Sequence, residues 1–464
     1  MLFNSLEFAG FFVVVVVAYH VLPRRPQNVL LLVASYWFYA AWDPRFLTLI
    51  WLSTIVDYVC GRHIGGAWGR SDETSARRWL ACSMIVNLGI LGIFKYAGFF
   101  ADSAASLAGA FGLELSGPTL DIVLPVGISF YTFQTMSYTI DVYRRKMEAT
   151  DNLLDFALFV AFFPQLVAGP IERASHLLPQ MQRDRSVQGR DVAEGVYLIA
   201  VGLVRKVVIA DTAGIIADRY FASPATFGSV ELFAGVVLYA LQIYGDFAGY
   251  SNIARGSARL LGFDLMRNFQ HPYFSRNITD FWRRWHMSLS TWLRDYLYIP
   301  LGGNQRGPRR TYVNLAATML LGGLWHGASW NFVVWGGLHG VYLAWHRLRA
   351  SGQRSSLRPV SATAATFVLV AFTWLPFRLE SMGEVGSYLT RLFSFTPGDF
   401  SALVPVAVLV LVLLLIDLPQ HLADDEFAGL GTTIPEFGVR LGTAVVLVVL
   451  FAGSTSTPFI YFQF

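Results

Sequence analysis

The strongest constraint on this chain is a series of long apolar runs that recurs from one end of the sequence to the other. Examples lie within residues 6–22, 122–140, 231–250 and 404–416, and several approach the roughly 20 residues that a helix needs to cross a bilayer. Of the 464 residues, 54% are hydrophobic and only 14% are charged, whereas soluble domains carry about 25% charged residues. We therefore predict an all-α, polytopic membrane protein in which residues 1–464 form one integral-membrane domain.

Clusters of basic residues between the apolar runs indicate which loops face the cytoplasm. Arg24 and Arg25 follow the first apolar run, so the positive-inside rule places the N-terminus outside. No Lys or Arg precedes Arg24, and we expect no cleaved signal peptide. Apolar segments between the clusters, such as 196–217 and 359–377, then give roughly 11 membrane passes.

One apolar segment differs from the others. Residues 153–170 are too few for two passes and are interrupted by Pro164 and Pro170. Non-helical backbone at membrane depth must be covered by protein or line a cavity. This segment is therefore predicted to be re-entrant.

The sequence gives little reason to expect a disulfide, a metal or a nucleic acid. Cys60 and Cys82 lie in apolar surroundings and are interpreted as small buried hydrophobic side chains. Metal-binding motifs, phosphate-binding loops and dinucleotide-binding motifs are absent from the sequence, which predicts no metal site and no permanently bound cofactor. The net charge of +4 suits loops at a membrane surface and requires no nucleic-acid partner.

The longest basic region, residues 273–310, has apolar residues at helical spacing. Asn277 is a suitable N-cap and Pro300 a suitable terminator, so we predict one interfacial or partly inserted helix between them. His286 lies four residues after Trp282, on the apolar face of that helix. We therefore expect its imidazole to point inward.

A second histidine lies in the uncharged stretch "LLGGLWHGASW", residues 320–330. His326 follows Arg310 by 16 residues, or roughly 24 Å of helix, in a bilayer core about 30 Å thick. An ionisable residue at that depth is a functional hypothesis by default, although a hydrogen bond between helices would also explain it. The flanking glycines allow close helix packing or a helix break. His339 is also deep and is interpreted as a packing residue.

Two inward-facing histidines suit acyl transfer, with a donor on one side and an acceptor on the other. A neutral imidazole can take the proton of a hydroxyl that attacks an activated carbonyl. It can also act as the nucleophile and carry the acyl group briefly. The residues leave both possibilities open.

Two long motifs closely resemble the membrane-bound O-acyltransferase family. They are "RNITDFWRRWHMSLSTWLRDYLYIPLGGN" at 276–304 and "GGLWHGASWNFVVWGGLHG" at 322–340. More narrowly, they are similar to the bacterial alginate O-acetyltransferase branch. Further similar stretches lie at 28–42, 124–138, 162–173 and 458–464, so the resemblance covers essentially the whole chain.

The resemblance implies a ring of tilted transmembrane helices around a central tunnel, with re-entrant and interfacial helices, in a bacterial inner membrane. It implies acetyl-CoA as the cytoplasmic acyl donor and a periplasmic acetyltransferase or other polysaccharide-modification protein as partner. The product would be an O-acetylated exported polysaccharide such as alginate. His326 matches the W-H-G motif and His286 the R-W-H-M-S-L-S motif, and both are expected to be catalytic. Arg283, Arg284 and Arg294 are candidates to contact the phosphates of the donor, although lipid headgroups are an equally good fit.

Other functions remain open at this point. A related branch exports D-alanyl groups to a cell-wall polymer. A transporter would use the histidines as a proton relay, but the inverted repeats typical of transporters are absent from the sequence. A non-enzymatic scaffold of a polysaccharide-secretion complex would need the histidines only for packing.

Overall fold

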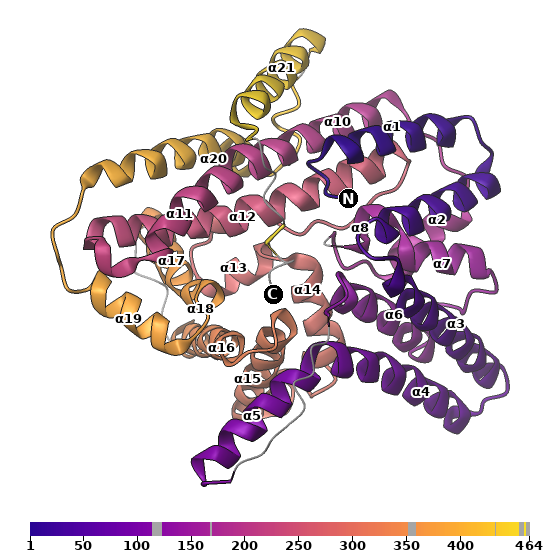
Figure 1. Cartoon of the computed structure of the whole chain (residues 1–464). Coiled ribbons are helices and arrows are strands. Elements are labelled where there is room, and N and C mark those ends of the chain that lie inside the picture. The colour runs from indigo at the N-terminus through magenta and orange to yellow at the C-terminus, as the bar shows by residue number, and fades with distance from the viewer. Residues whose placement is uncertain (114–122, 168, 351–358, 432, 454–458, 461–464) are drawn as a thin grey trace. The chain divides into compact units, whose positions relative to one another are not determined.

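A computed structural model describes the chain apart from residues 114–122, 168, 351–358, 432, 454–458 and 461–464 (Figure 1). Every regular element in the described part is a helix, which confirms the all-α prediction for those residues. Two compact units are present. The first comprises Met1–Gln188 and Ala258–Met266, and the second comprises Gly189–Ser257 and Arg267–Phe464.

The described residues of the first unit form nine α-helices: α1 Leu6–His20, α2 Arg24–Ala40, α3 Leu47–Gly69, α4 Glu73–Leu91, α5 Ala97–Ala110, α6 Ile128–Tyr143, α7 Leu153–Ala161, α8 Phe163–Leu166 and α9 Ala174–Gln182. A π-helical stretch, Gly92–Tyr96, joins α4 to α5. The centre of the unit is α6, on which nearly every residue is buried. Helices α3 and α4 pack against it and against each other.

The predicted interruption of the apolar segment 153–170 occurs at Phe162, between α7 and α8. Both helices are almost entirely buried. The backbone N–H of Phe163, freed by the interruption, donates to Ser35 Oγ at 3.0 Å. A buried backbone group needs such a partner. The broken geometry is thus confirmed, while the re-entrant position in a bilayer stays a prediction.

Helices of the second unit begin with α10 Gly189–Leu203, the π-helix η3 Val204–Asp211, α11 Thr212–Ala222 and α12 Ser229–Leu260, whose last three residues belong to the first unit. They continue with α13 Ile278–Arg284, α14 Met287–Leu293, the π-helix η6 Arg294–Tyr298, α15 Gly307–His326 and α16 Trp330–Ala350. The last are α17 Pro359–Thr373, α18 Leu375–Arg378, α19 Met382–Leu392, α20 Leu403–Ala423 and α21 Ile434–Phe451.

Five helical segments in the described part are long and apolar enough to cross a membrane: Glu73–Ala110, Ser229–Leu260, Pro359–Arg378, Phe400–Ala423 and Ile434–Phe451. The predicted count of roughly 11 passes is therefore not confirmed. Residues 196–217, counted as a pass from their apolar character, also contain Arg205, Lys206 and Asp211. On α21 no residue is buried, although most of the helix is aliphatic. Such an apolar surface is typical of contact with lipid.

The two cysteines differ in environment. Both are free, and Cys60 is buried as expected. Cys82 is exposed, so the expectation that it would be buried is wrong. The apolar run that contains it has an outward face as well as an inward one.

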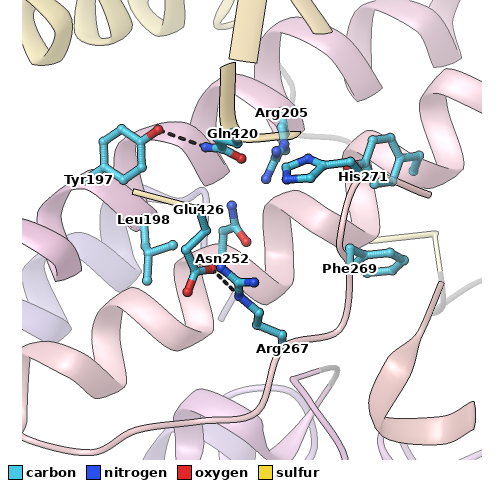
Figure 2. A pocket seen from close by; sticks show the side chains of 10 residues that line it. Tyr197, Leu198, Arg205, Asn252, Arg267, Phe269, His271, Gln420 and Glu426 are labelled. Carbon is cyan, nitrogen blue, oxygen red and sulfur yellow. Dashed lines mark hydrogen bonds and ion pairs between the residues drawn. The ribbon is translucent and has the colours of Figure 1, made fainter. Parts of the chain in front are cut away.

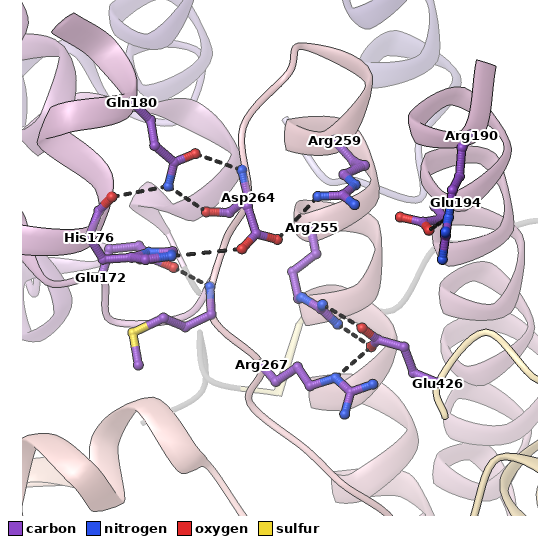
Figure 3. A network of polar contacts seen from close by, with 11 residues as sticks. Glu172, His176, Gln180, Arg190, Glu194, Arg255, Arg259, Asp264, Arg267 and Glu426 are labelled. Carbon is purple, nitrogen blue, oxygen red and sulfur yellow. Dashed lines mark hydrogen bonds and ion pairs between the residues drawn. The ribbon is translucent and has the colours of Figure 1, made fainter. Parts of the chain in front are cut away.

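Polar contacts stabilise each unit separately (Figure 3). In the first unit His176 Nδ1 lies 2.9 Å from Glu172 Oε2, and its other nitrogen lies 3.7 Å from Asp264. The carboxylates of Asp264 and Glu172 raise the pKa of His176 to about 10. The backbone N–H of Met266 donates to Glu172 at 2.6 Å, so this cluster ties α9 to residues 258–266.

In the second unit Glu426 pairs with Arg255 at 2.7 Å and with Arg267 at 2.8 Å (Figure 3). Burial opposes ionisation of this carboxylate, but the two guanidinium groups outweigh that effect and lower the pKa of Glu426 to about 2. Glu426 follows α20 in the chain, while Arg255 is on α12. The cluster therefore joins the end of α20 to α12.

Candidate functional site

The helix that carries His286 is broken at that residue. Helix α13 ends at Arg284, α14 begins at Met287, and His286 itself has φ 42° and ψ 54°, in the left-handed region. The predicted continuous helix is therefore wrong here. Its predicted start is confirmed, because the Asn277 side chain accepts a hydrogen bond from Asp280 N at 2.9 Å. The helical structure ends just before Pro300, at Tyr298.

A non-helical segment, residues 267–271, provides hydrogen-bond partners for backbone groups at the break. Gln270 N donates to Arg284 O at 3.0 Å, and Met287 N donates to Asn268 O at 2.8 Å. The Asn268 side chain accepts from Ser288 Oγ at 2.6 Å. These bonds replace those of a continuous helix. These hydrogen bonds involve residues 268 and 270, which lie outside the region 273–310 and do not affect its helical periodicity.

The imidazole of His286 is completely buried, with 0% exposed. Its ring centroid lies 4.6 Å from that of Phe247 and 6.0 Å from that of Trp325. The expectation that His286 points inward is thus confirmed, but the break and not a helical face directs it there. Burial among aromatic rings favours the neutral form of an imidazole.

His326 is the last residue of α15, and Gly327 follows in extended conformation. Helices α15 and α16 approach very closely. A Cβ added to Gly323 would lie 2.1 Å from the Phe332 carbonyl oxygen, and one added to Gly336 would lie 2.2 Å from that of Met319. The close approach expected from the glycines around His326 is confirmed, and so is the end of the helix at this point.

The structure brings the two predicted histidines together although 40 residues separate them in the chain. Their ring centroids lie 6.2 Å apart. Trp335 and Phe377 also contact His326, at 5.1 and 5.3 Å between centroids. His326 itself is only 5% exposed. The site is thus a pair of imidazoles enclosed by aromatic side chains from α12, α15, α16 and α18.

His339 has a different environment. Trp282 Nε1 donates to His339 Nδ1 at 3.2 Å, so Nδ1 is the acceptor and the neutral ring carries its proton on Nε2. Nε2 lies 3.1 Å from Thr373 Oγ1, and that hydroxyl donates to Val370 O at 2.6 Å. Both ring nitrogens are therefore used within the protein, which supports the interpretation of His339 as a packing residue.

The three candidate arginines lie on the helices around the break. Arg283 and Arg294 are exposed, whereas Arg284 is half-buried. Arg284 pairs with Asp280 at 2.9 Å and Arg294 with Asp295 at 2.7 Å. An exposed ion pair contributes little stability, so the guanidinium group of Arg294 remains available to an anion.

Several residues of the site were not predicted from the sequence. Trp335 and Phe377 enclose His326, and Asn268 fixes the break at His286. The tryptophan falls within a conspicuous motif, but its contact with the histidine depends on the fold. Among the described residues, no group of three or more His, Cys, Asp and Glu side chains could hold a metal ion.

Part of the similar stretch 458–464 is described. Ile460 N donates to Asp246 Oδ2 at 2.6 Å, and the Phe459 ring lies 5.8 Å from that of Phe247. The other residues of this stretch lie outside the described part of the chain.

Comparison with known proteins gives a consistent result. Residues 142–375 match the model of the membrane-bound O-acyltransferase family. The chain is 41% identical to a protein named probable alginate O-acetylase AlgI from Azotobacter vinelandii, over 100% of both chains. It is 35% identical to the peptidoglycan O-acetyltransferase of Helicobacter pylori, over 82% of this chain and 76% of that protein. With the teichoic acid D-alanyltransferase of Streptococcus thermophilus it shares 29% identity over 53% of this chain and 64% of the relative.

Proposed function

Because the chain belongs to the membrane-bound O-acyltransferase family, we propose that it transfers an acetyl group from cytoplasmic acetyl-CoA across a bacterial inner membrane. The acetyl group would serve the O-acetylation of an exported polysaccharide such as alginate, through a periplasmic partner protein. The observation that carries this proposal is the enclosed histidine pair, His286 and His326, with ring centroids 6.2 Å apart.

Acetyl is favoured over D-alanyl by the extent of similarity. The O-acetylase relative matches at 41% identity over the whole chain, whereas the D-alanyltransferase matches at 29% over 53% of it. The family supplies the reaction class, and the relatives suggest the acyl group. We further propose that residues 1–464 act as one integral-membrane enzyme with its helices around a central tunnel.

In the proposed reaction a hydroxyl attacks the thioester carbonyl, a new C–O bond forms and the C–S bond breaks. His326 would take the hydroxyl proton and return it to the departing thiolate. The C-terminal end of α15 has partial negative charge, which stabilises the imidazolium formed in between. Attack by the imidazole itself, with a brief acyl-histidine, is the second route for the same residue.

The two histidines have separate roles in this scheme. His326 would act on the acetyl carbonyl, and His286 would lie on the opposite side of the acyl group. The two ring centroids lie 6.2 Å apart, so both imidazoles can contact the same small acyl group. Arg283, Arg284 and Arg294 would contact donor phosphates, since guanidinium groups recognise phosphate well.

The test is acetyl transfer in membrane vesicles with labelled acetyl-CoA supplied on the cytoplasmic face. We expect labelled acetyl groups to cross the membrane with the wild-type protein. For His326→Ala, transfer should fall by about 10²- to 10⁴-fold, the usual range for a lost general base. His286→Ala should also be impaired. His63→Ala is the matched control, because His63 is an exposed histidine stacked on Trp79 in the first unit. Wild-type transfer by a well-expressed His326→Ala protein would refute the proposed role.

A further inference from the structure

Three helices of the first unit, α3, α4 and α6, share a buried network of polar side chains at the place where they pack together (Figure 1). Each helix supplies two residues that are four positions apart and therefore lie on one face. They are Ser53 and Asp57 on α3, Ser83 and Asn87 on α4, and Thr135 and Thr139 on α6. All six are at most 1% exposed. We refer to these six residues as the polar network.

Hydrogen bonds of the polar network connect Asp57 to both of the other helices. Ser83 Oγ lies 2.5 Å from Asp57 Oδ1 and 2.9 Å from Thr139 Oγ1. Asn87 Nδ2 donates to Asp57 Oδ2 at 2.8 Å, and Asn87 Oδ1 accepts from Ser53 Oγ at 2.9 Å. Asp57 therefore contacts α4 directly and α6 through Ser83.

The side chains bonded to Asp57 are a hydroxyl and an amide, and no described residue forms an ion pair with it. Carboxylates of the second unit differ in this respect. In the polar pocket of Figure 2, Glu426 pairs with Arg267 at 2.8 Å, and the buried Asp417 pairs with Arg205 at 2.5 Å. A buried charge without a partner is costly, and a carboxyl group in that position is neutralised by a proton instead.

A count of hydrogen atoms also favours a protonated Asp57. Three contacts follow one another, from Asp57 to Ser83, from Ser83 to Thr139, and from Thr139 Oγ1 to the Met136 carbonyl oxygen at 3.1 Å. Each hydroxyl supplies one hydrogen, and an ionised carboxylate supplies none. An ionised Asp57 thus leaves two hydrogens for three contacts. A protonated Asp57 provides the third, because the carboxyl donates to Ser83, Ser83 to Thr139 and Thr139 to the carbonyl.

Helix α4 depends on this network more than its two neighbours do. Its buried residues are Ala76, Ser83, Asn87 and Leu91. Two of these four bond to Asp57. Ionisation of Asp57 would place an uncompensated charge in the contact that holds α4, and α4 is therefore the helix that this charge would loosen.

The other titratable groups around α3 do not compensate a charge on Asp57. Cys60 on α3 and Tyr138 on α6 face Asp57, Cys82 on α4 contacts Cys60, and all three are neutral in mild acid. The remaining charged groups on or beside these helices bond to residues outside the polar network. They are Asp141 with Lys146, Arg62 with Asp151, and Asp155 on α7 with Asn28 and Asn152.

We propose that Asp57 is a proton-binding site, and that the bound proton holds α4 against α3 and α6. The folded chain keeps this proton at pH values where an aspartic acid of the unfolded chain, which ionises near pH 4, has lost it. As the pH rises further, the proton is released and the attachment of α4 weakens. The site does not depend on the proposed acyl transfer, because the polar network lies in the first unit and both predicted catalytic histidines lie in the second.

The first test compares unfolding of the wild-type chain and of Asp57→Asn by denaturant, in neutral detergent, from about pH 4.5 to pH 8. Where the folded state binds one proton more than the unfolded state, the folding equilibrium constant falls about tenfold for each pH unit. Asparagine has a similar shape and can donate to Ser83, but it cannot ionise. We therefore expect Asp57→Asn to fold and to lack this part of the pH dependence.

Asp151→Asn is the matched control in the same unit. Asp151 is an exposed residue that pairs with Arg62 of α3 at 3.1 Å, and exposed pairs contribute little stability. This variant should keep the pH dependence of the wild type. Equal pH dependence in the wild type and in Asp57→Asn would overturn the proposal, as would a wild-type stability that depends on sodium ions and not on pH.

Infrared spectroscopy detects the proton directly, because a protonated carboxylic acid has a C=O stretching band that a carboxylate lacks. Aspartate labelled with ¹³C identifies the band in the wild-type chain, and the difference spectrum against Asp57→Asn assigns it. We expect the band at pH 5 and its loss as the pH rises. Its absence at pH 5 would refute the site even if Asp57→Asn failed to fold.

Hydrogen exchange tests whether the proton holds α4. At pH 8, where Asp57 has lost its proton, the amides of residues 83–91 should exchange faster in the wild type than in Asp57→Asn. Both proteins are measured at one pH, so the intrinsic exchange rates are equal. Amides within α12 in the second unit serve as the internal control. Equal exchange of α4 in the two proteins would overturn the proposed role of the proton.

Discussion

The two predicted histidines lie in neighbouring parts of the chain that are built in opposite ways. His326 ends α15, a regular helix held against α16 by glycines whose backbones nearly touch. His286 lies in a break that residues 267–271 hold open through backbone hydrogen bonds. Both arrangements bury an imidazole. The sequence signal for the position of His326 is local, because the glycines lie beside the histidine. The signal for the position of His286 lies in a separate segment, residues 267–271.

The hairpin of α15 and α16 provides the largest expected effect. In Gly336→Ala the new methyl group would lie 2.2 Å from the Met319 carbonyl oxygen, a backbone atom that cannot move without shifting the helix. We expect a loss of about 3 kcal/mol of unfolding free energy or more, at the upper end for overpacking. Thermal unfolding of the purified protein in detergent measures it.

Gly337→Ala is the matched control on the next residue. Its added Cβ would lie 3.5 Å from Leu320 Cδ2, an ordinary contact. Alanine also favours a helix over glycine by about 1 kcal/mol. Gly337→Ala should therefore be neutral or slightly stabilising. Equal losses of unfolding free energy at residues 336 and 337 would show that α15 and α16 do not approach each other this closely.

His339 tests whether a third histidine of the same hairpin is only a packing residue. His339→Phe would leave the Trp282 N–H and the Thr373 hydroxyl without their partner. We expect a loss of about 2 kcal/mol in unfolding free energy, within the usual cost of unsatisfied buried groups. Acetyl transfer by the folded fraction should stay within a few-fold of wild type. Loss of transfer at unchanged stability would instead place His339 in the chemistry.

Asn268 tests the hydrogen bonds that stabilise the break. Asn268→Leu removes the acceptor of Ser288 Oγ and the donor to Ser251 Oγ. We expect a loss of about 1–2 kcal/mol and slower acetyl transfer, because His286 depends on this segment for its position. Gln270→Leu is the control, since its side chain bonds to Asp424 in an exposed position. If both variants behave alike, the side chain of Asn268 does not support the break.

The same contrast explains what the sequence could predict. The apolar runs predict helices, Asn277 a helix cap, and the glycines beside His326 a close helix approach. These are local signals, and the structure confirms all three. Helical spacing of the apolar residues placed His286 inward, but it also predicted an unbroken helix. That spacing gives no indication of the backbone hydrogen bonds to residues 268 and 270. The predicted number of membrane passes is not confirmed for a related reason. An apolar run can be a buried short helix such as α7 or a charged one such as η3.

The smallest expected effect isolates the backbone at residue 286. His286→Gly and His286→Ala both remove the imidazole, so their difference reports the left-handed conformation alone. That conformation costs a residue with a Cβ roughly 1–2 kcal/mol, but costs glycine little. We expect the glycine variant to be more stable by about 1 kcal/mol. At Ala316, exposed within α15, the order should reverse, with Ala316→Gly less stable by about 1 kcal/mol. The same sign at both positions would mean that the helix continues through residue 286, and the hydrogen bonds from residues 268 and 270 would then have no role in orienting the histidine.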